Sequence, residues 1–124
     1  MRALVIDDSR AMRAILRNLL SEIGFEVSEA GDGKEGLERV RGSSPFDLFL
    51  VDWNMPRMNG LEFVRAVGAE GSRGHTRLLM ITTESEISQM TLALEAGADE
   101  YLMKPFDREA LVAKLELLGL AAAE

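Results

Sequence analysis

Five short apolar runs alternate with five stretches of helical periodicity, and this alternation limits the chain to few folds. The runs have the length of strands, and three are almost wholly apolar, as strands covered on both faces are. We predict strands at Ala3–Ile6, Phe25–Ala30, Leu48–Val51, Arg77–Thr82 and Tyr101–Met103. Strict alternation of strand and helix indicates an α/β fold, in which right-handed crossovers build a doubly wound parallel sheet with helices on both faces.

The segments between these runs repeat apolar residues at helical spacing. In the first segment, Ser9 is a suitable N-cap and Gly24 a suitable stop. We expect its apolar residues on one inward face: Met12, Ile15, Leu16, Leu19, Leu20 and Ile23. We predict the other helices around Leu37 and Val40, around Leu61, Val64 and Val67, over Ser85–Gly97, and after an Asp107 cap with Leu111, Leu115 and Leu118 inward.

Composition narrows the function classes. The 124 residues fit one domain, 1–124, without an output domain, and the lack of cysteine excludes disulfides and thiolate metal sites. No apolar run approaches the ~18 residues of a membrane span, and no secretory signal is evident, so we expect a cytoplasmic protein. A net charge of −7 argues against nucleic-acid binding. One helix carries a row of basic residues, either a solvated face or a docking surface for an acidic partner: Arg10, Arg13 and Arg17.

Polar side chains follow four of the predicted strands. Asp7 and Asp8 follow the first strand, Asp52 the third and Lys104 the fifth, while Thr82 ends the fourth. Ligands of parallel sheets bind at the carboxyl ends of the strands, so we expect these groups to converge there. Three carboxylates in one cleft resist full ionisation, and a divalent cation relieves their repulsion. Oxygen ligands favour Mg²⁺, Mn²⁺ or Ca²⁺ over zinc or copper, and a site with open positions suits Mg²⁺.

A metal, an ammonium and a hydroxyl together would surround a phosphoryl group. The chain has no cysteine, and its single histidine, His75, lies in a predicted loop, so a carboxylate is the candidate nucleophile. Asp52 is central in the sheet and is our choice. Each of these residues alone has an ordinary role as a cap, a turn residue or a strand end. Their joint placement on four strand ends carries the hypothesis.

Four segments, "VIDDSRAMR", "VDWNMPRMNG", "LLMITTE" and "EAGADEYLMKPF", resemble the motifs of response-regulator receiver domains. Within that family the chain is similar to the stand-alone, chemotaxis-type (CheY-like) regulators, and the resemblance covers essentially all of it. The resemblance implies a flavodoxin-like sheet of order 2-1-3-4-5 with five helices. It also implies a cis peptide bond between Lys104 and Pro105.

The resemblance further implies how the site is used. Asp52 would be the phosphoacceptor. Asp8 and Asp52 would ligate Mg²⁺ directly, the backbone carbonyl of Asn54 would be a third ligand, and Asp7 would act mainly through a bound water. The end of the strand would free that carbonyl from sheet pairing. Gly60 would then relieve crowding where the third helix begins, although a plain turn explains this glycine equally well.

Other residues acquire roles from the same resemblance. Thr82 would hydrogen-bond a phosphoryl oxygen, Lys104 would pair with the phosphoryl group, and Tyr101 would change rotamer as Thr82 moves. Receivers tune the loss of the phosphoryl group through the residues two after the aspartate and two after the threonine, here Asn54 and Glu84. This pair predicts a short-lived phosphorylated state.

The implied function is a phosphorylation-dependent switch. A histidine kinase would donate the phosphoryl group from a phosphohistidine, and the chain would catalyse its own modification and its loss without being a conventional enzyme. The signal would pass to an unknown protein target through helix 4, strand 5 and helix 5, by a monomer or a phosphorylation-dependent dimer. Ile87 stands where chemotaxis regulators have a basic residue, which questions a flagellar-switch target. The expected read-out residues are Ile87, Tyr101 and Lys114; Met90 belongs either to an apolar patch with Ile87 or to the core.

Three alternatives stay open at this point. A receiver can serve as a phosphorylation-independent interaction module. An aspartate-nucleophile phosphatase would carry a DxD motif after the first strand, where this chain has "DDS". A flavodoxin-like electron carrier would need hydroxyls and amides, rather than two carboxylates, to hold a phosphate.

Overall fold

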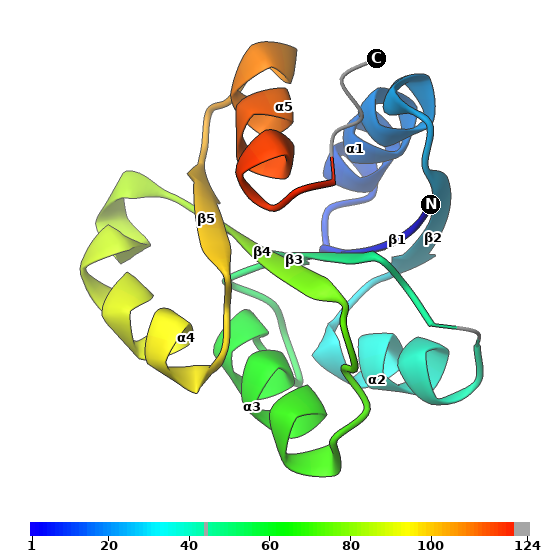
Figure 1. Cartoon of the computed structure of the whole chain (residues 1–124). Coiled ribbons are helices and arrows are strands. Elements are labelled where there is room, and N and C mark those ends of the chain that lie inside the picture. Colours follow the sequence, from blue (N-terminus) through cyan, green and yellow to red (C-terminus); the bar gives the residue numbers. More distant parts are fainter. Residues whose placement is uncertain (44, 121–124) are drawn as a thin grey trace.

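A computed structural model describes residues 1–43 and 45–120, and these residues form a single parallel sheet between two layers of helices (Figure 1). The strands lie in the order β2-β1-β3-β4-β5, which confirms the predicted fold class and strand order. The elements along the chain are β1 (Arg2–Ile6), α1 (Arg10–Ile23), β2 (Glu26–Ala30), α2 (Gly33–Arg41), β3 (Leu48–Asp52), α3 (Gly60–Glu70), β4 (Arg77–Thr82), the 3-10 helix η1 (Glu84–Gln89), α4 (Met90–Ala96), β5 (Glu100–Met103) and α5 (Arg108–Leu117).

Helices α1 and α5 cover one face of the sheet, and α2, α3 and α4 cover the other (Figure 1). Each face has its own apolar cluster, and the central strand β3 is buried along its whole length. The register pairs Ile6 of β1 with Val51 of β3. The next residues, Asp7 and Asp52, are therefore level with each other where the two strands end.

Helix α1 confirms the predicted cap and stop but not the whole predicted inward face. The Ser9 side chain accepts a hydrogen bond from the Met12 backbone N–H, and Gly24 ends the helix at φ 118°. Leu16 and Leu20 are fully buried, whereas Ile15 is 50% exposed. The prediction for Ile15 was wrong because it lies about 100° around the helix from Leu16, at the margin of the buried stripe.

The predicted helix over Ser85–Gly97 is only half right. Residues Glu84–Gln89 form a 3-10 helix, and the α-helix begins at Met90. Only one apolar side chain of the first half, Ile87, packs against the core. A short 3-10 helix that leads into the buried Met90 is enough to bury that side chain. Met90 thus belongs to the core rather than to a surface patch. The predicted cap Asp107 is the N-cap of α5. None of the described helices is long and apolar enough to cross a membrane.

Candidate functional site

Three carboxylates meet where β1 and β3 end. One oxygen from each of Asp7, Asp8 and Asp52 lies within 4.8 Å of the others. Asp7 and Asp52 are buried and Asp8 is exposed, so the cluster opens to solvent on one side. The parallel register therefore brings together the carboxylates that the sequence places at two separate strand ends.

The Asp52 carboxylate is close to both a like charge and an opposite charge. Burial and then the nearby Asp7 carboxylate raise the pKa of Asp52 to about 6. The Lys104 ammonium acts in the other direction, because its Nζ donates a hydrogen bond of 3.1 Å to Asp52 Oδ1. Asp52 is thus a buried acid whose charge is only partly compensated by the protein.

Asp7 carries an oxygen without a partner. Its Oδ1 accepts a hydrogen bond of 2.8 Å from the Ser9 backbone N–H. Its Oδ2 is the only buried side-chain oxygen or nitrogen among the described residues that lacks a hydrogen-bond partner. Burial also raises the pKa of Asp7. An orphaned carboxylate oxygen beside two further carboxylates fits a hard divalent cation, since oxygen is the ligand that Mg²⁺ prefers.

Thr82 is fully buried at the end of β4. Its hydroxyl donates weakly, at 3.3 Å, to the Thr83 carbonyl and to Glu86 Oε1. Glu86 Oε1 also accepts a 3.0 Å hydrogen bond from the Thr83 backbone N–H. The sequence analysis did not single out Glu86, although the spacing Thr83-x-x-Glu86 is the signature of a capping box. The side chain of Glu84 lies outside what the structure describes.

The loop between β3 and α3 carries Asn54, which is exposed. Both flanks of the loop are fixed: the Trp53 N–H donates to the Ile81 carbonyl, and the Gly60 N–H donates to the Trp53 carbonyl, each at 2.9 Å. A Cβ on Gly60 would lie 2.5 Å from the Asp52 carbonyl oxygen. Crowding therefore requires the glycine there, as one of the two sequence interpretations expected.

The predicted read-out residues lie on β5, α5 and η1. The Lys114 Nζ donates to Glu100 Oε1 at 3.0 Å and lies 4.7 Å from the centre of the Tyr101 ring. Tyr101 and Ile87 are half-buried against the same apolar cluster. Lys114 therefore already has two partners within the protein, and no pattern in the sequence indicated these contacts. The bond between Lys104 and Pro105 is cis, as the resemblance implies.

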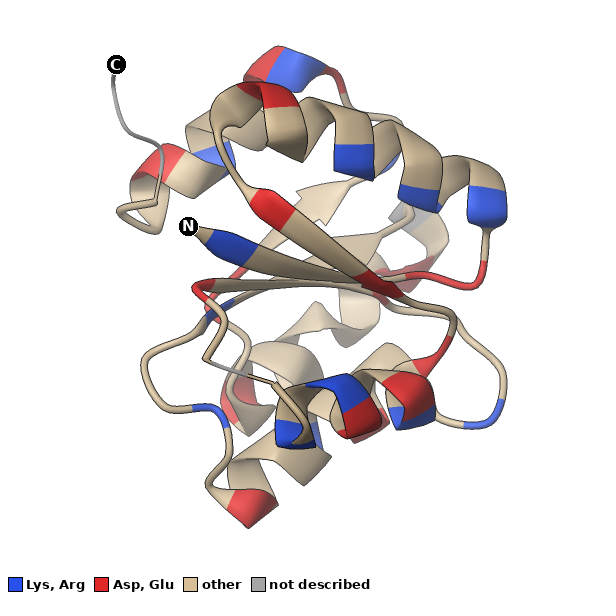
Figure 2. Cartoon of the chain, turned by 90° about the vertical axis from the view of Figure 1, so that its right-hand side faces the viewer, with Lys and Arg blue, Asp and Glu red and all other residues tan. Residues whose placement is uncertain are grey.

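The arginine row on α1 is largely paired. Basic residues recur along the long helix above the sheet (Figure 2). Both Arg13 and Arg17 form ion pairs with Glu29 of β2, at 3.2 and 2.7 Å. Arg13 Nη1 also donates to the Asp7 backbone carbonyl at 2.7 Å, and so fixes the backbone of the acidic cluster. This contact is another that sequence spacing does not reveal.

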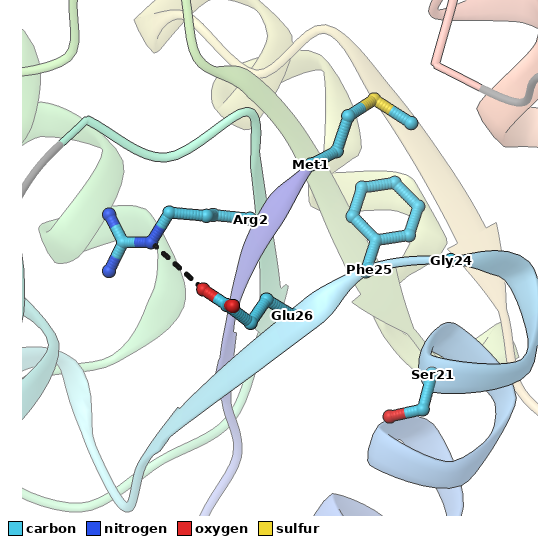
Figure 3. Close-up of a pocket in the computed structure, with 6 residues that line it drawn as sticks. All are labelled: Met1, Arg2, Ser21, Gly24, Phe25 and Glu26. Carbon is cyan, nitrogen blue, oxygen red and sulfur yellow. Dashed lines mark ion pairs between the residues drawn. The ribbon is translucent and has the colours of Figure 1, made fainter.

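A second hollow lies at the opposite end of the sheet, and its chemistry differs. It is lined by residues around Arg2 and Phe25, and two of the lining residues, Arg2 and Glu26, form an ion pair (Figure 3). The five-residue strand β1 separates it from Asp7 by roughly 15 Å. His75 is exposed in the loop before β4, at this same end. Neither feature belongs to the carboxylate cluster.

Comparison with known proteins settles the family. The family model for the response regulator receiver domain matches residues 3–116. The chain belongs to the response regulator receiver family. As a CheY-like receiver it is a domain of two-component phosphorylation signalling rather than a conventional enzyme. Receivers bind Mg²⁺ through an acidic pocket, and the cluster of Asp7, Asp8 and Asp52 is the counterpart here.

Chemotaxis receivers are similar to this one over nearly their whole length. Chemotaxis protein CheY1 of Helicobacter pylori strain J99 is 41% identical over 119 residues, which are 95% of this chain and 96% of the relative. Chemotaxis protein CheY of Pseudomonas aeruginosa is 40% identical over 117 residues, 94% of each chain. The structure of CheY4 of Vibrio cholerae superposes with a TM-score of 0.86 at 36% identity, covering 94% of this chain and 97% of that one. This membership favours the receiver interpretation over the phosphatase and electron-carrier alternatives.

Proposed function

We propose that this receiver accepts a phosphoryl group on Asp52 from the phosphohistidine of a histidine kinase and passes the signal on through α4, β5 and α5. The observation that carries the proposal is the cluster itself. Asp52 is buried, shares the cluster with Asp7, whose Oδ2 has no partner, and is contacted by Lys104 at 3.1 Å. A buried carboxylate that has a raised pKa, one cationic neighbour and a nearby carboxylate oxygen without a partner is typical of a functional site. Such a carboxylate is suited to phosphoryl transfer rather than to a purely structural role.

Asp8, Asp52 and the Asn54 backbone carbonyl would hold Mg²⁺, with Asp7 acting through a bound water. When bound, the cation would offset the charge of the carboxylates and of the phosphoryl oxygens. The chain's own residues do the rest, because phosphoryl transfer depends mostly on positioning and charge. Lys104 holds the Asp52 carboxylate in place and faces the incoming negative charge.

Two displacements at phosphorus make up the cycle. In the first, an Asp52 carboxylate oxygen forms a bond to phosphorus while the bond from phosphorus to the imidazole nitrogen of the donor breaks, and the donor histidine leaves. In the second, water attacks phosphorus, the bond to Asp52 breaks, and free phosphate and the carboxylate are released. Asn54 lies two residues after Asp52, and Glu84 lies two residues after Thr82. We propose that these two residues set a short lifetime for the phosphorylated state.

The docking surface for the donor is proposed beside Lys104. An apolar groove of about 490 Å³ runs along α1 next to the site, lined by Met12, Ile15, Leu19, Thr83, Lys104, Pro105 and Phe106. The half-exposed Ile15 gives a partner helix an apolar surface to pack against. A phosphohistidine on such a helix would then be delivered near Lys104.

The outgoing signal is proposed to start at Thr82. Its hydroxyl contacts Glu86 in η1, so a turn of Thr82 toward a phosphoryl oxygen would release that contact. Tyr101 would move in response, and the partner face would comprise Ile87, Tyr101 and Lys114. Exposed apolar residues on these elements support a contact surface for a target or a second copy: Leu92, Leu94, Met103 and Leu117. A cytoplasmic location and action as one receiver domain without an output domain stay predictions.

Intact mass after incubation with acetyl phosphate tests the proposal. With Mg²⁺ we expect a single phosphoryl adduct on the wild-type chain and none on Asp52→Asn. Without Mg²⁺, the wild-type adduct should also be absent. No adduct under any condition would overturn the proposal and favour a phosphorylation-independent interaction module.

A further inference from the structure

The loop between β3 and α3 contains a residue in a costly backbone conformation. Arg57 has φ 64°, and no other non-glycine residue in 1–43 or 45–120 has a positive φ. The Met58 N–H donates to the Pro56 carbonyl at 2.6 Å, so Arg57 is the central residue of a three-residue turn. Turns of this kind with positive φ are strained and persist only where surrounding contacts hold them.

The contact that holds this turn is an ion pair with Asp32, the N-cap of α2. Arg57 Nε donates to Asp32 Oδ2 at 2.8 Å, and Arg57 Nη2 donates to the same oxygen. Asp32 is 1% exposed, whereas the Arg57 side chain is 72% exposed. Burial acts to raise the pKa of Asp32, but hydrogen bonds from the Glu35 backbone and from Arg57 lower it overall. The buried carboxylate is thus an ionised anchor for an exposed arginine.

A second contact fastens the next residue of the loop to α2. The Gly33 N–H donates to the Met58 carbonyl at 3.0 Å. Gly33 has no room for a side chain, since a Cβ there would lie 2.7 Å from Met58 Cγ and 2.8 Å from the Met58 carbonyl oxygen. Residues 57 and 58 are therefore fixed to α2, while Trp53 and Gly60 are fixed to the strand ends. Asn54 lies between these two points of attachment.

We propose that Arg57 and Asp32 form a positioning pair for the metal site. The pair holds the strained turn, the turn fixes the segment that carries Asn54, and the affinity for Mg²⁺ depends on that segment. This inference rests on the proposed use of the acidic cluster and adds two residues that lie outside it. Neighbours that orient metal ligands typically change metal affinity by 10- to 100-fold when they are replaced.

Equilibrium titration with Mg²⁺, followed by Trp53 fluorescence, tests the pair without any phosphodonor. Arg57→Ala keeps the cost of the positive φ but cannot hold Asp32. Asp32→Asn keeps a capping oxygen but removes the charge. We expect each variant to weaken Mg²⁺ binding by about tenfold. Arg57→Lys, which keeps a cation, should fall between these variants and the wild type.

Arg41→Ala is the matched control. Arg41 of α2 also forms a two-contact ion pair, with Glu70 of α3, but at the far ends of the same two helices. Its loss should leave the Mg²⁺ affinity within about twofold of the wild type. The double variant Asp32→Asn/Arg57→Ala should bind about as weakly as the weaker single variant, because both changes break one interaction. At saturating Mg²⁺ the phosphorylation rate of each variant should return close to that of the wild type.

Wild-type affinity in Arg57→Ala and Asp32→Asn would overturn this inference and leave the proposed function intact. Equal weakening in Arg41→Ala would also overturn it, since the effect would then come from general loosening of α2 and α3. Failure of the wild type itself to bind Mg²⁺ would overturn both proposals. Should Arg57→Ala fold poorly by circular dichroism, Asp32→Asn and Arg57→Lys decide the outcome.

Discussion

At the amino-terminal edge of the sheet, charged groups meet partners of opposite charge, whereas at the carboxyl-terminal edge three carboxylates meet one another beside a single ammonium. Arg73 illustrates the first edge: it donates to the Thr76 and Gly97 carbonyls and to Asp99, which in turn accepts from the Leu78 N–H. Asp7 illustrates the second, with a buried oxygen that lacks a partner. One edge is built for stability, and the other retains unsatisfied charge.

This difference teaches where to look for function in a fold of this kind. Buried polar groups normally find partners, so a cluster that does not is under some other constraint. At the carboxyl-terminal edge we propose that this constraint is the binding of a cation and a phosphoryl group.

Removal of Lys104 takes away the only ion pair that Asp52 makes among the described residues. In Lys104→Met we expect the initial rate of adduct formation from acetyl phosphate to fall by about a hundredfold, because a positioned cation is lost from the transfer site. Lys104→Arg serves as the control that keeps the charge. An unchanged rate in Lys104→Met would show that this contact does not support transfer.

Removal of Arg73 tests the opposite edge. Arg73→Ala removes the donor to the Thr76 and Gly97 carbonyls and the ion-pair partner of Asp99, which keeps only the Leu78 N–H. We expect the free energy of unfolding in urea to fall by about 2 kcal/mol, with no change in Mg²⁺ affinity. A weakened affinity for Mg²⁺ would contradict the functional separation of the two edges.

Neutralising Asp7 should have the reverse effect on stability. In Asp7→Asn one of three mutually repelling carboxylates is lost, while the amide oxygen can still accept from the Ser9 N–H. Without divalent cations we expect the variant to be more stable than the wild type by about 1 kcal/mol, and to bind Mg²⁺ less tightly. A lower free energy of unfolding for Asp7→Asn than for the wild type, measured in urea with a chelator present, would contradict this prediction. The three carboxylates would then not destabilise the fold by their mutual repulsion.

Asp32 is a paired carboxylate at the carboxyl-terminal edge, in contrast to Asp7. The contribution of this pairing can be measured from the pH dependence of the protein's stability. Its folded-state pKa is lowered from 3.8, so its ionised form stabilises the fold. This contribution is present above the unfolded-state pKa and is lost as the pH falls through the folded-state pKa. Between about pH 5 and about pH 2.5 the stability of the wild type should therefore fall more than that of Asp32→Asn. Parallel urea midpoints for the two proteins would contradict this.

The strand ends were predictable from the sequence because the length of an apolar run and the residue that ends it are local features. Apolar runs located β3, and an aspartate at the end of a strand must lie at the sheet edge, so Asp7 and Asp52 were placed at one edge. That they are neighbours there followed from the strand order that the resemblance implied. The caps Ser9 and Asp107 were equally readable, since a cap is bonded within three residues of itself.

Contacts between distant elements were not predictable. The pairing of Arg57 with Asp32 joins residues 25 positions apart, and no local pattern marks Arg57 for a positive φ. The contact of Arg13 with the Asp7 carbonyl depends on the rotation of α1 about its axis, which the apolar pattern fixed too loosely to place even Ile15. The apolar periodicity identifies the buried face of a helix. A side-chain hydrogen bond depends in addition on the rotamer of that side chain, which the periodicity does not specify.

The most direct test of the account is the effect of Mg²⁺ on stability. Urea unfolding of the wild type and of Asp52→Asn should be compared with and without Mg²⁺. Because a ligand that binds the folded state stabilises it, Mg²⁺ should raise the free energy of unfolding of the wild type. Asp52→Asn should be the more stable protein without Mg²⁺ and should gain much less from it. An equal gain in both proteins, or none in either, would contradict the claim that a divalent cation completes this edge of the sheet.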